Sequence, residues 1–265
     1  MIRPLKIMYH NPVGNDAYDQ VFLDALRARR LPGTEIVVTS LHPEEGAFNH
    51  IEYRSYEAMI TAGMLRAVRS AAKEGFDAFV IGCFYDTGLL DARELSGDMV
   101  VMAPCVAACE IATSLANRFG IIVGRRKWVE QMGETVKRYG YSDKCSGFYA
   151  VGLGVTEFQQ DHAETERRLL DAGRRAVDED YAEALILGCT LEIGFHEKLQ
   201  DKLGVPVIDP SIAAFKRAEY AGSLIRDCGW VPSRKWTSEA PPEAEMAALG
   251  VFDAKNAFGN RIGDT

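Results

Sequence analysis

Short apolar runs alternate with longer amphipathic stretches along the first 229 residues of the chain. Most runs are apolar throughout, and they lie at 5–9, 34–40, 77–82, 99–102, 119–124, 148–152, 183–188 and 205–209. Continuous apolar runs are typical of strands buried on both faces of a parallel sheet. Helical apolar spacing, often followed by a glycine, occurs between them at 16–30, 53–74, 104–117, 126–139, 161–179, 195–203 and 211–226. The alternation predicts an α/β fold with parallel sheets and right-handed crossovers.

The segment 230–265 departs from this pattern, because it follows no predicted strand. We interpret it as a C-terminal tail that could be an arm, a lid or a partly disordered segment. Its large aromatic residues indicate that part of the tail packs on the rest of the chain; they are Trp230, Trp236, Phe252 and Phe258.

Composition and charge narrow the class of protein. The 265 residues are enough for one large α/β unit or two lobes, and 47% apolar with 26% charged residues is an ordinary globular balance. A net charge of -8 disfavours nucleic acid or an anionic membrane as the main partner. No apolar run approaches the roughly 20 residues of a membrane span, and the N-terminus resembles no signal peptide. We expect a cytoplasmic protein that acts on a small molecule.

Six cysteines are present, and we expect reduced thiols rather than disulfides in a cytoplasmic chain of this size. No Cys-x-x-Cys pair occurs, so a zinc site is not expected.

One phrase occurs twice in the sequence. "DAFVIGCFYDTGL" at 77–89 returns as "EALILGCTLEIGF" at 183–195, which places Cys83 and Cys189 at an offset of 189 − 83 = 106 residues. The same offset relates Gly82 to Gly188, Asp86 to Glu192, Gly88 to Gly194, Val101 to Val207, Pro104 to Pro210, Ala107 to Ala213 and Ala108 to Ala214. This recurrence indicates an internal duplication. We therefore predict two pseudo-symmetric lobes, each a mostly parallel sheet flanked by helices, with the active-site cleft between them.

The two repeated cysteines stand where ligands bind in open parallel sheets, at the carboxyl ends of strands. Two opposed thiols can invert a carbon centre, since one removes a proton and the other returns one on the opposite face. This chemistry needs no metal, pyridoxal phosphate or nucleotide. A thiol titrates near ~8.5, and a helix N-terminus favours its thiolate. A buried cysteine is often only a small apolar residue, which is our interpretation of the other four. The matched pair favours chemistry for Cys83 and Cys189.

Acidic residues follow both cysteines by three positions. Asp86 and Glu192 are interpreted as carboxylates at helix starts, with tuning of the thiols or contact with substrate as the alternative. Phe84 and Tyr85 are expected to line the pocket.

Four motifs carry a resemblance to a known family: "HNPVGND", "GCFYDTGL", "EIATSLANRFGIIVG" and "LGCTLEIGF" followed by "VPVIDP". Together they resemble the aspartate/glutamate/hydantoin racemase superfamily, within it the hydantoin racemase branch that includes allantoin racemases, over about 5–229. The resemblance implies cofactor-independent racemisation of a 5-substituted hydantoin or allantoin, with Cys83 and Cys189 as the two bases. It also implies that Asn11 hydrogen-bonds the substrate, and that Phe84 and Thr190 bind its carbonyl or carboxylate oxygens.

The resemblance further implies a homo-oligomer and a lobe division that is not sequential. We expect 1–104 with 209–229 as the first lobe, 105–208 as the second, and 230–265 as the tail.

Departures from the family pattern keep other functions open. His10-Asn11-Pro12 replaces the Asp-Ser-Gly of the amino-acid racemases, which favours a hydantoin-like ring. "GCTLEIG" instead leans toward the amino-acid racemases. An aspartate or glutamate racemase and a maleate-type cis–trans isomerase are therefore the alternatives, with a non-enzymatic binding protein less favoured.

Overall fold

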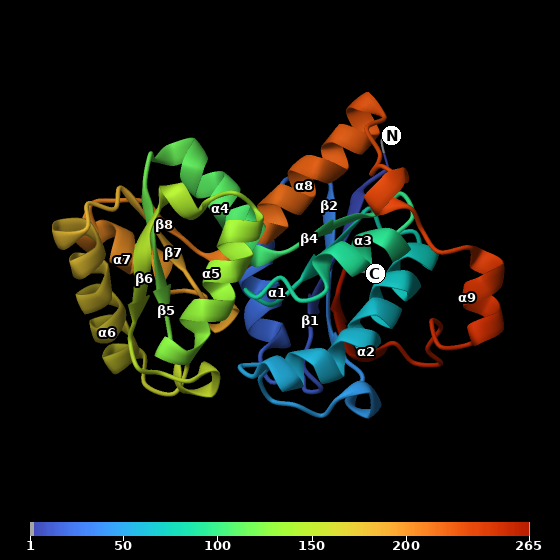
Figure 1. Ribbon diagram of the computed structural model, residues 1–265, viewed down its shortest axis with the longest axis horizontal. Coiled ribbons are helices and arrows are strands. Elements are labelled where there is room, and N and C mark those ends of the chain that lie inside the picture. Colours follow the sequence, from blue (N-terminus) through green and yellow to red (C-terminus); the bar gives the residue numbers. More distant parts are fainter. Residues whose placement is uncertain (1–2, 265) are drawn as a thin grey trace. The chain divides into compact units, whose positions relative to one another are not determined.

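The computed structural model describes residues 3–264, which form two compact α/β units (Figure 1). The first unit contains 3–82, 87–103 and 215–264, and the second contains 83–86 and 104–214. The α/β class with largely parallel sheets is confirmed. The lobe boundaries expected from the sequence stay a prediction, and the segment 83–86 groups with the second unit.

The first unit is built on a five-stranded sheet with the order β4-β3-β1-β2-β9. Its strands are β1 (Leu5–Asn11), β2 (Thr34–Leu41), β3 (Ala78–Ile81), β4 (Val100–Met102) and β9 (Phe258–Gly263). The first four pair in parallel, whereas β9 pairs with β2 antiparallel. Helix α1 (Asp19–Arg27) lies on one face of this sheet, and α2 (Arg54–Lys73) and α3 (Leu89–Leu95) lie on the other, as right-handed crossovers require (Figure 1).

The second unit repeats this plan with a parallel sheet of order β6-β5-β7-β8. Its strands are β5 (Phe119–Val123), β6 (Cys145–Ala150), β7 (Ala184–Leu187) and β8 (Val207–Ile208). The helices are α4 (Pro104–Leu115), α5 (Val129–Arg138), α6 (His162–Arg174), α7 (His196–Leu203) and α8 (Pro210–Cys228), whose residues from 215 onward group with the first unit. Because β4-β3-β1-β2 and β8-β7-β5-β6 are the same order, the topology supports the duplication inferred from the sequence.

The central strands are buried along nearly their whole length, which explains why the sequence shows continuous apolar runs. Ile7, Met8 and Tyr9 of β1 are fully buried, as are Ile121 and Ile122 of β5. Helices on both faces of each sheet keep both faces of the central strands away from water, so these strands are mainly apolar. Among the helices of 3–264, none combines the length and apolar character that crossing a membrane requires.

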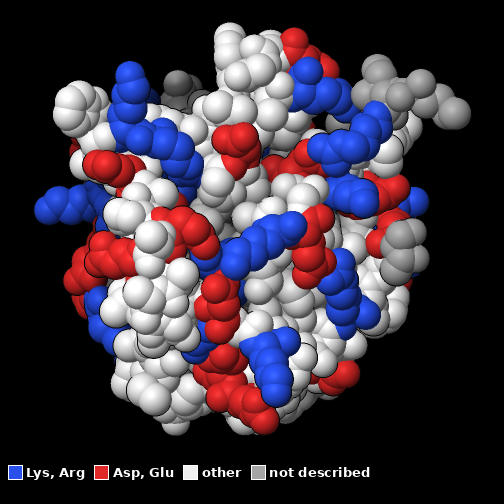
Figure 2. Space-filling model, turned by 90° about the vertical axis from the view of Figure 1, so that its right-hand side faces the viewer, with Lys and Arg blue, Asp and Glu red and all other residues white. Residues whose placement is uncertain are grey.

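The tail forms ordered structure against the first unit. Helix α9 (Glu243–Leu249) buries Met246, and β9 completes the first sheet. Arg69 of α2 binds Asp253 (3.0 Å) and also Glu243, and Lys73 binds Asp253 at 2.6 Å. Figure 2 shows acidic and basic side chains interspersed over the face turned to the viewer. Neither β9 nor α9 was expected from the sequence, nor was α3.

His10 is the next-to-last residue of β1 and is fully buried. Its Nδ1 is 2.9 Å from Thr39 Oγ1, and its ring lies 5.4 Å from that of Phe79 and 6.1 Å from that of Phe258. Within the described residues its Nε2 is buried without a hydrogen-bond partner. Burial lowers the pKa of His10 from 6.5 to about 3. The imidazole is therefore neutral at pH 7.

This burial predicts acid sensitivity. The unfolded chain binds a proton at His10 below pH 6.5 and the native chain does not until about pH 3, so native stability falls as the pH drops through this window. The contribution approaches about 1.4 kcal/mol per pH unit. Urea unfolding at pH 7, 6, 5 and 4 should show a steeper loss for the wild type than for His10→Gln. Parallel pH curves would contradict the assignment.

Candidate active site

The two cysteine turns have the same main-chain construction. Cys83 is separated from the end of β3 by Gly82 alone, and Cys189 is separated from the end of β7 by Gly188 alone. The carbonyl oxygen of each cysteine accepts a hydrogen bond, 3.0 Å long in both cases, from the N–H of the acidic residue three positions later. Both cysteines belong to the second unit and are 9% and 7% exposed, respectively. No disulfide joins any of the six cysteines, all of which lie in the described part of the chain.

The glycine before each cysteine is required by a close approach of backbone. The N–H of Gly82 donates to the carbonyl of His10 (2.8 Å), and that of Gly188 donates to the carbonyl of Ile122 (2.7 Å). A Cβ on Gly82 would lie 2.8 Å from the His10 oxygen, and one on Gly188 would lie 2.6 Å from the Ile122 oxygen. Any side chain here would push the strand end away. The Gly-Cys pair thus places each thiol directly beyond a central strand.

Asp86 fixes the turn that carries Cys83. Its Oδ1 accepts the N–H of Cys105 (2.8 Å) and its Oδ2 accepts the N–H of Val106 (2.9 Å), both in the first turn of α4. The backbone of Asp86 has φ of 55°, in the left-handed region that aspartate tolerates better than most residues. A helix N-terminus satisfied by a buried carboxylate is a strong anchor. The expectation of a carboxylate at a helix start therefore fits Asp86.

Glu192, the counterpart of Asp86 in the repeat, makes different hydrogen bonds. Its Oε2 accepts the N–H of Cys189 at 3.0 Å, and its Oε1 is buried without a partner in the described structure. Burial, reinforced by the charge of Asp209, raises the pKa of Glu192 well above its usual value. Glu192 is therefore protonated more readily than an exposed glutamate.

The α8 N-terminus takes its cap from another residue. Asp209 Oδ1 accepts the N–H of Ser211 (2.9 Å) and of Ile212 (3.2 Å). The residue 106 positions before Asp209 is Ala103, which has no carboxylate. The two turns thus have the same main-chain hydrogen bond, but the charged groups around them differ.

The remaining predicted site residues are all buried. Phe84 and Tyr85 lie between Cys83 and Asp86, and Thr190 begins the short 3-10 helix after Cys189 (Thr190–Glu192). These three belong to the second unit. Asn11 ends β1 in the first unit, where its Nδ2 donates to Asp19 Oδ1 at 3.3 Å. Their roles toward a substrate stay predictions.

The sequence analysis did not identify two residues near Asn11 in the first unit, Asp19 and Asn260. Asp19, in the first turn of α1, accepts from Asn11 and, through Oδ2, from Asn260 Nδ2 of β9 at 3.0 Å. Asn260 and Asp19 are 241 residues apart, so no local pattern signals the pair.

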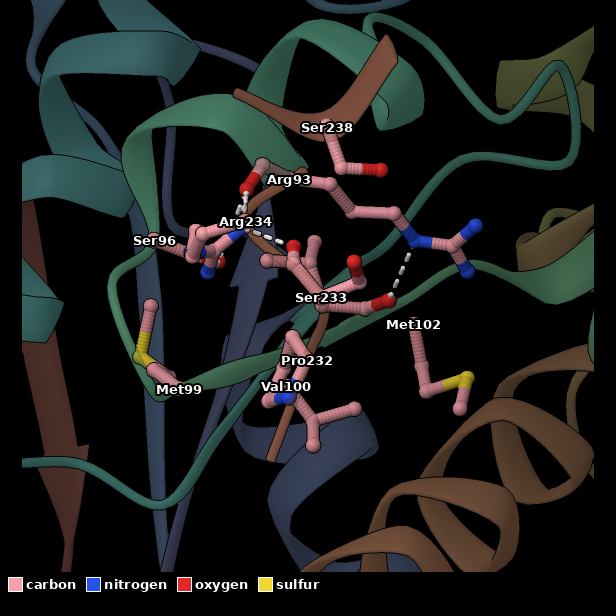
Figure 3. A pocket seen from close by; sticks show the side chains of 10 residues that line it. Arg93, Ser96, Met99, Val100, Met102, Pro232, Ser233, Arg234 and Ser238 are labelled. Carbon is pink, nitrogen blue, oxygen red and sulfur yellow. Dashed lines mark hydrogen bonds between the residues drawn. The ribbon is translucent and has the colours of Figure 1, made fainter. Parts of the chain in front are cut away.

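A separate pocket of about 230 Å³ lies in the first unit (Figure 3), where the tail crosses β4. Arg93 Nε donates to the Val101 carbonyl (3.3 Å), and Arg234 Nη2 donates to Ser96 Oγ (3.1 Å). The Arg234 contact joins the tail to the residue that ends α3, whereas the Arg93 contact joins α3 to β4. The pocket contains none of the six predicted site residues; its lining is Arg93, Ser96, Met99, Val100, Val101, Met102, Pro232, Ser233, Arg234 and Ser238. Elsewhere within 3–264, no cluster of three or more His, Cys, Asp or Glu is placed to hold a metal ion.

Comparison with known proteins finds relatives that match most of the chain. A family model described as Asp/Glu/hydantoin racemase matches residues 7–218. The hydantoin racemase of Paenarthrobacter aurescens is 31% identical over 242 residues, which cover 91% of this chain and 99% of that protein. The hydantoin racemase of Pseudomonas sp. (strain NS671) is 32% identical over 249 residues, or 94% of this chain and 97% of the relative. The structure of an allantoin racemase from Klebsiella pneumoniae superposes with a TM-score of 0.82 at 30% identity, covering 90% of this chain and 94% of that one.

Proposed function

Because the chain belongs to the Asp/Glu/hydantoin racemase family and is a racemase, we propose that it inverts the C–H stereocentre of a hydantoin-type ring, a 5-substituted hydantoin or allantoin, by proton transfer between Cys83 and Cys189. The observation that carries this proposal is the matched construction of the two cysteine turns. Both turns lie in one unit, and each presents a thiol directly after a Gly at the end of a central strand.

The proposed reaction conserves protons. The thiolate of one cysteine takes the proton from the ring carbon, so a C–H bond breaks, an S–H bond forms and the electron pair moves onto the adjacent carbonyl as an enolate. The thiol of the other cysteine then gives its proton to the opposite face of the same carbon, and its sulfur becomes a thiolate. The opposite enantiomer uses the two groups in reverse. A thiol base near neutral pH suits a ring C–H that a carbonyl already acidifies.

Surrounding residues complete the proposed site. Phe84 and Tyr85 shape the pocket, Thr190 and the backbone at Phe84 bind ring oxygens, and Asn11 hydrogen-bonds the ring. The expectations of a cytoplasmic homo-oligomer that needs no cofactor, and binds neither nucleic acid nor membrane, also remain proposals.

The test is proton exchange in D2O without added cofactor. Single enantiomers of allantoin, 5-alkyl and 5-benzyl hydantoins, aspartate and glutamate are incubated with pure protein and in protein-free controls. NMR follows deuterium at the stereocentre and polarimetry follows optical rotation. We expect deuterium incorporation with loss of rotation on one or more hydantoin-type rings, above the spontaneous rate. Activity confined to aspartate or glutamate would replace the proposed substrate class with the amino acids, and no exchange on any compound would overturn the proposal.

A further inference from the structure

Asn11, Ser40 and Asn260 lie side by side across three neighbouring strands of the first sheet. Asn11 of β1 is in register with Ser40 of β2, and Ser40 is in register with Asn260 of β9. Asp19, from the first turn of α1, receives Nδ2 of Asn11 (3.3 Å) and Nδ2 of Asn260 (3.0 Å) on its two carboxylate oxygens. The tail therefore contributes directly to the surroundings of Asn11.

The carboxylate decides which way the Asn11 amide points. An ionised carboxylate only accepts hydrogen bonds, so both asparagine side chains must turn their NH2 groups toward it. Asn11 Oδ1 then faces away from Asp19. Asp19 is 1% exposed, and burial raises its pKa while the bonds from Asn260 and Asn11 oppose that rise. Removing one donor weakens the ionised state that orients the other amide.

We propose that Asp19 and Asn260 are positioning residues that orient the side-chain oxygen Oδ1 of Asn11 toward the substrate as a fixed acceptor. The site would then select rings with an unsubstituted N–H. This inference rests on the proposed function, because it names what Asn11 recognises in the ring. A hydantoin ring carries two N–H groups, and either one can donate to an amide oxygen. An N-methyl group in that place would remove the donor and bring carbon against oxygen. A buried acceptor left without its donor discriminates strongly between such analogues.

The proposal also gives the tail a role in the reaction. Asn260 reaches Asp19 only because β9 pairs with β2, and the β2–β9 register shifts directly after Ser40. The strand thus holds a side chain from residue 260 next to one from residue 19. A tail that served only as packing would not need an amide at this position.

The test compares KM and kcat of variants on a 5-substituted hydantoin and on its 1-methyl and 3-methyl derivatives. For Asn260→Ala we expect KM on the unsubstituted ring to rise about 5- to 20-fold with kcat changed less than about threefold, as for loss of one oriented hydrogen bond. The preference for the ring with N–H over the worse methyl derivative should shrink by a similar factor. Asp19→Asn should show the same split, because its own amide no longer fixes the orientation of Asn11.

Two controls separate positioning from a structural role. Arg261→Gln changes the next residue of β9, whose side chain pairs with Glu74 at 2.7 Å, and should leave both KM and the methyl preference unchanged. In an Asn11→Ala background, Asn260→Ala should add almost nothing further. Circular dichroism and the melting temperature verify folding. If Asn260→Ala does not fold, Asn260→Ser replaces it in the same measurements.

The outcomes are distinguishable. The wild type could racemise hydantoins while Asn260→Ala lowers activity equally on N–H and N-methyl rings. That result would overturn this inference and leave the proposed function standing. Additive effects of Asn11→Ala and Asn260→Ala overturn it as well. A wild type inactive on every hydantoin overturns the proposed function, and this inference falls with it.

Discussion

Replacing Cys83 or Cys189 by serine is expected to lower kcat/KM for racemisation by at least about 10³-fold, because each hydroxyl titrates far above neutral pH and neither abstracts nor returns the proton well. Circular dichroism should show both variants folded, since serine is nearly the size of cysteine. Initial rates of optical-rotation loss from each enantiomer provide the measurement. The matched control is Cys228→Ser, since Cys228 is exposed at the end of α8 and should keep full activity.

Isotope exchange sharpens this prediction. In D2O the single remaining thiolate can remove a proton from one face and return deuterium to the same face. Cys83→Ser should therefore exchange one enantiomer without inversion, and Cys189→Ser should exchange only the other. If both variants exchange the same enantiomer, or if either still racemises at the wild-type rate, the assignment of one base to each face is wrong.

Asp86→Ala should give the second large effect, on both stability and activity. The substitution leaves two buried N–H groups of the α4 N-terminus without acceptors and releases the turn that carries Cys83. We expect the free energy of unfolding to fall by about 2–4 kcal/mol and kcat/KM to fall by about 10- to 100-fold. Urea unfolding and steady-state racemisation measure the two quantities. Asp86→Asn, which retains one acceptor oxygen, should lie between Asp86→Ala and the wild type.

Glu192→Gln is the matched comparison in the repeat. Burial shifts Glu192 toward its protonated form, which an amide imitates, so we expect Glu192→Gln to change activity by less than about threefold. Because its native pKa is raised, the stabilising effect of the proton is present at low pH and is lost as the pH rises through that pKa. The Gln variant should therefore lose less stability than the wild type in alkaline buffer. Equal damage from Asp86→Asn and Glu192→Gln would show that the two acids have the same role.

Most of the fold was predictable because its strands are buried on both faces. Each of the eight apolar runs overlaps a strand, and for every one of these strands but β6 continuous burial explains the continuous apolar signal. The strand β9, with sequence FGNRIG, carries no such signal. Its half-exposed pattern is set by pairing with β2 more than two hundred residues away, and that pairing is a tertiary event. Helix α3 was missed because it spans only seven residues.

The site was predictable as far as the repeat extends. The 106-residue offset located both Gly-Cys turns and their acids, and the structure gives them the same carbonyl-to-N–H hydrogen bond. The divergence between Asp86 and Glu192 was not foreseen, because it depends on which residue caps the following helix. The same offset aligns Asp209 with Ala103, and that mismatch was the available signal. No comparable signal exists for Asn260, which belongs to the tail outside the repeat.

The antiparallel strand β9 also bears on how the protein behaves when it is shortened. Without it, the N–H and C=O groups along the outer side of β2, whose sequence is TEIVVTSL, would become a free sheet edge rich in β-branched residues. Such an edge is a template for pairing with another chain. With β9 in place, the edge strand of the sheet is instead β9, a six-residue strand that contains Asn260, Arg261 and two glycines. Chains truncated before residue 258 should therefore self-associate, because β9 no longer covers the edge of β2.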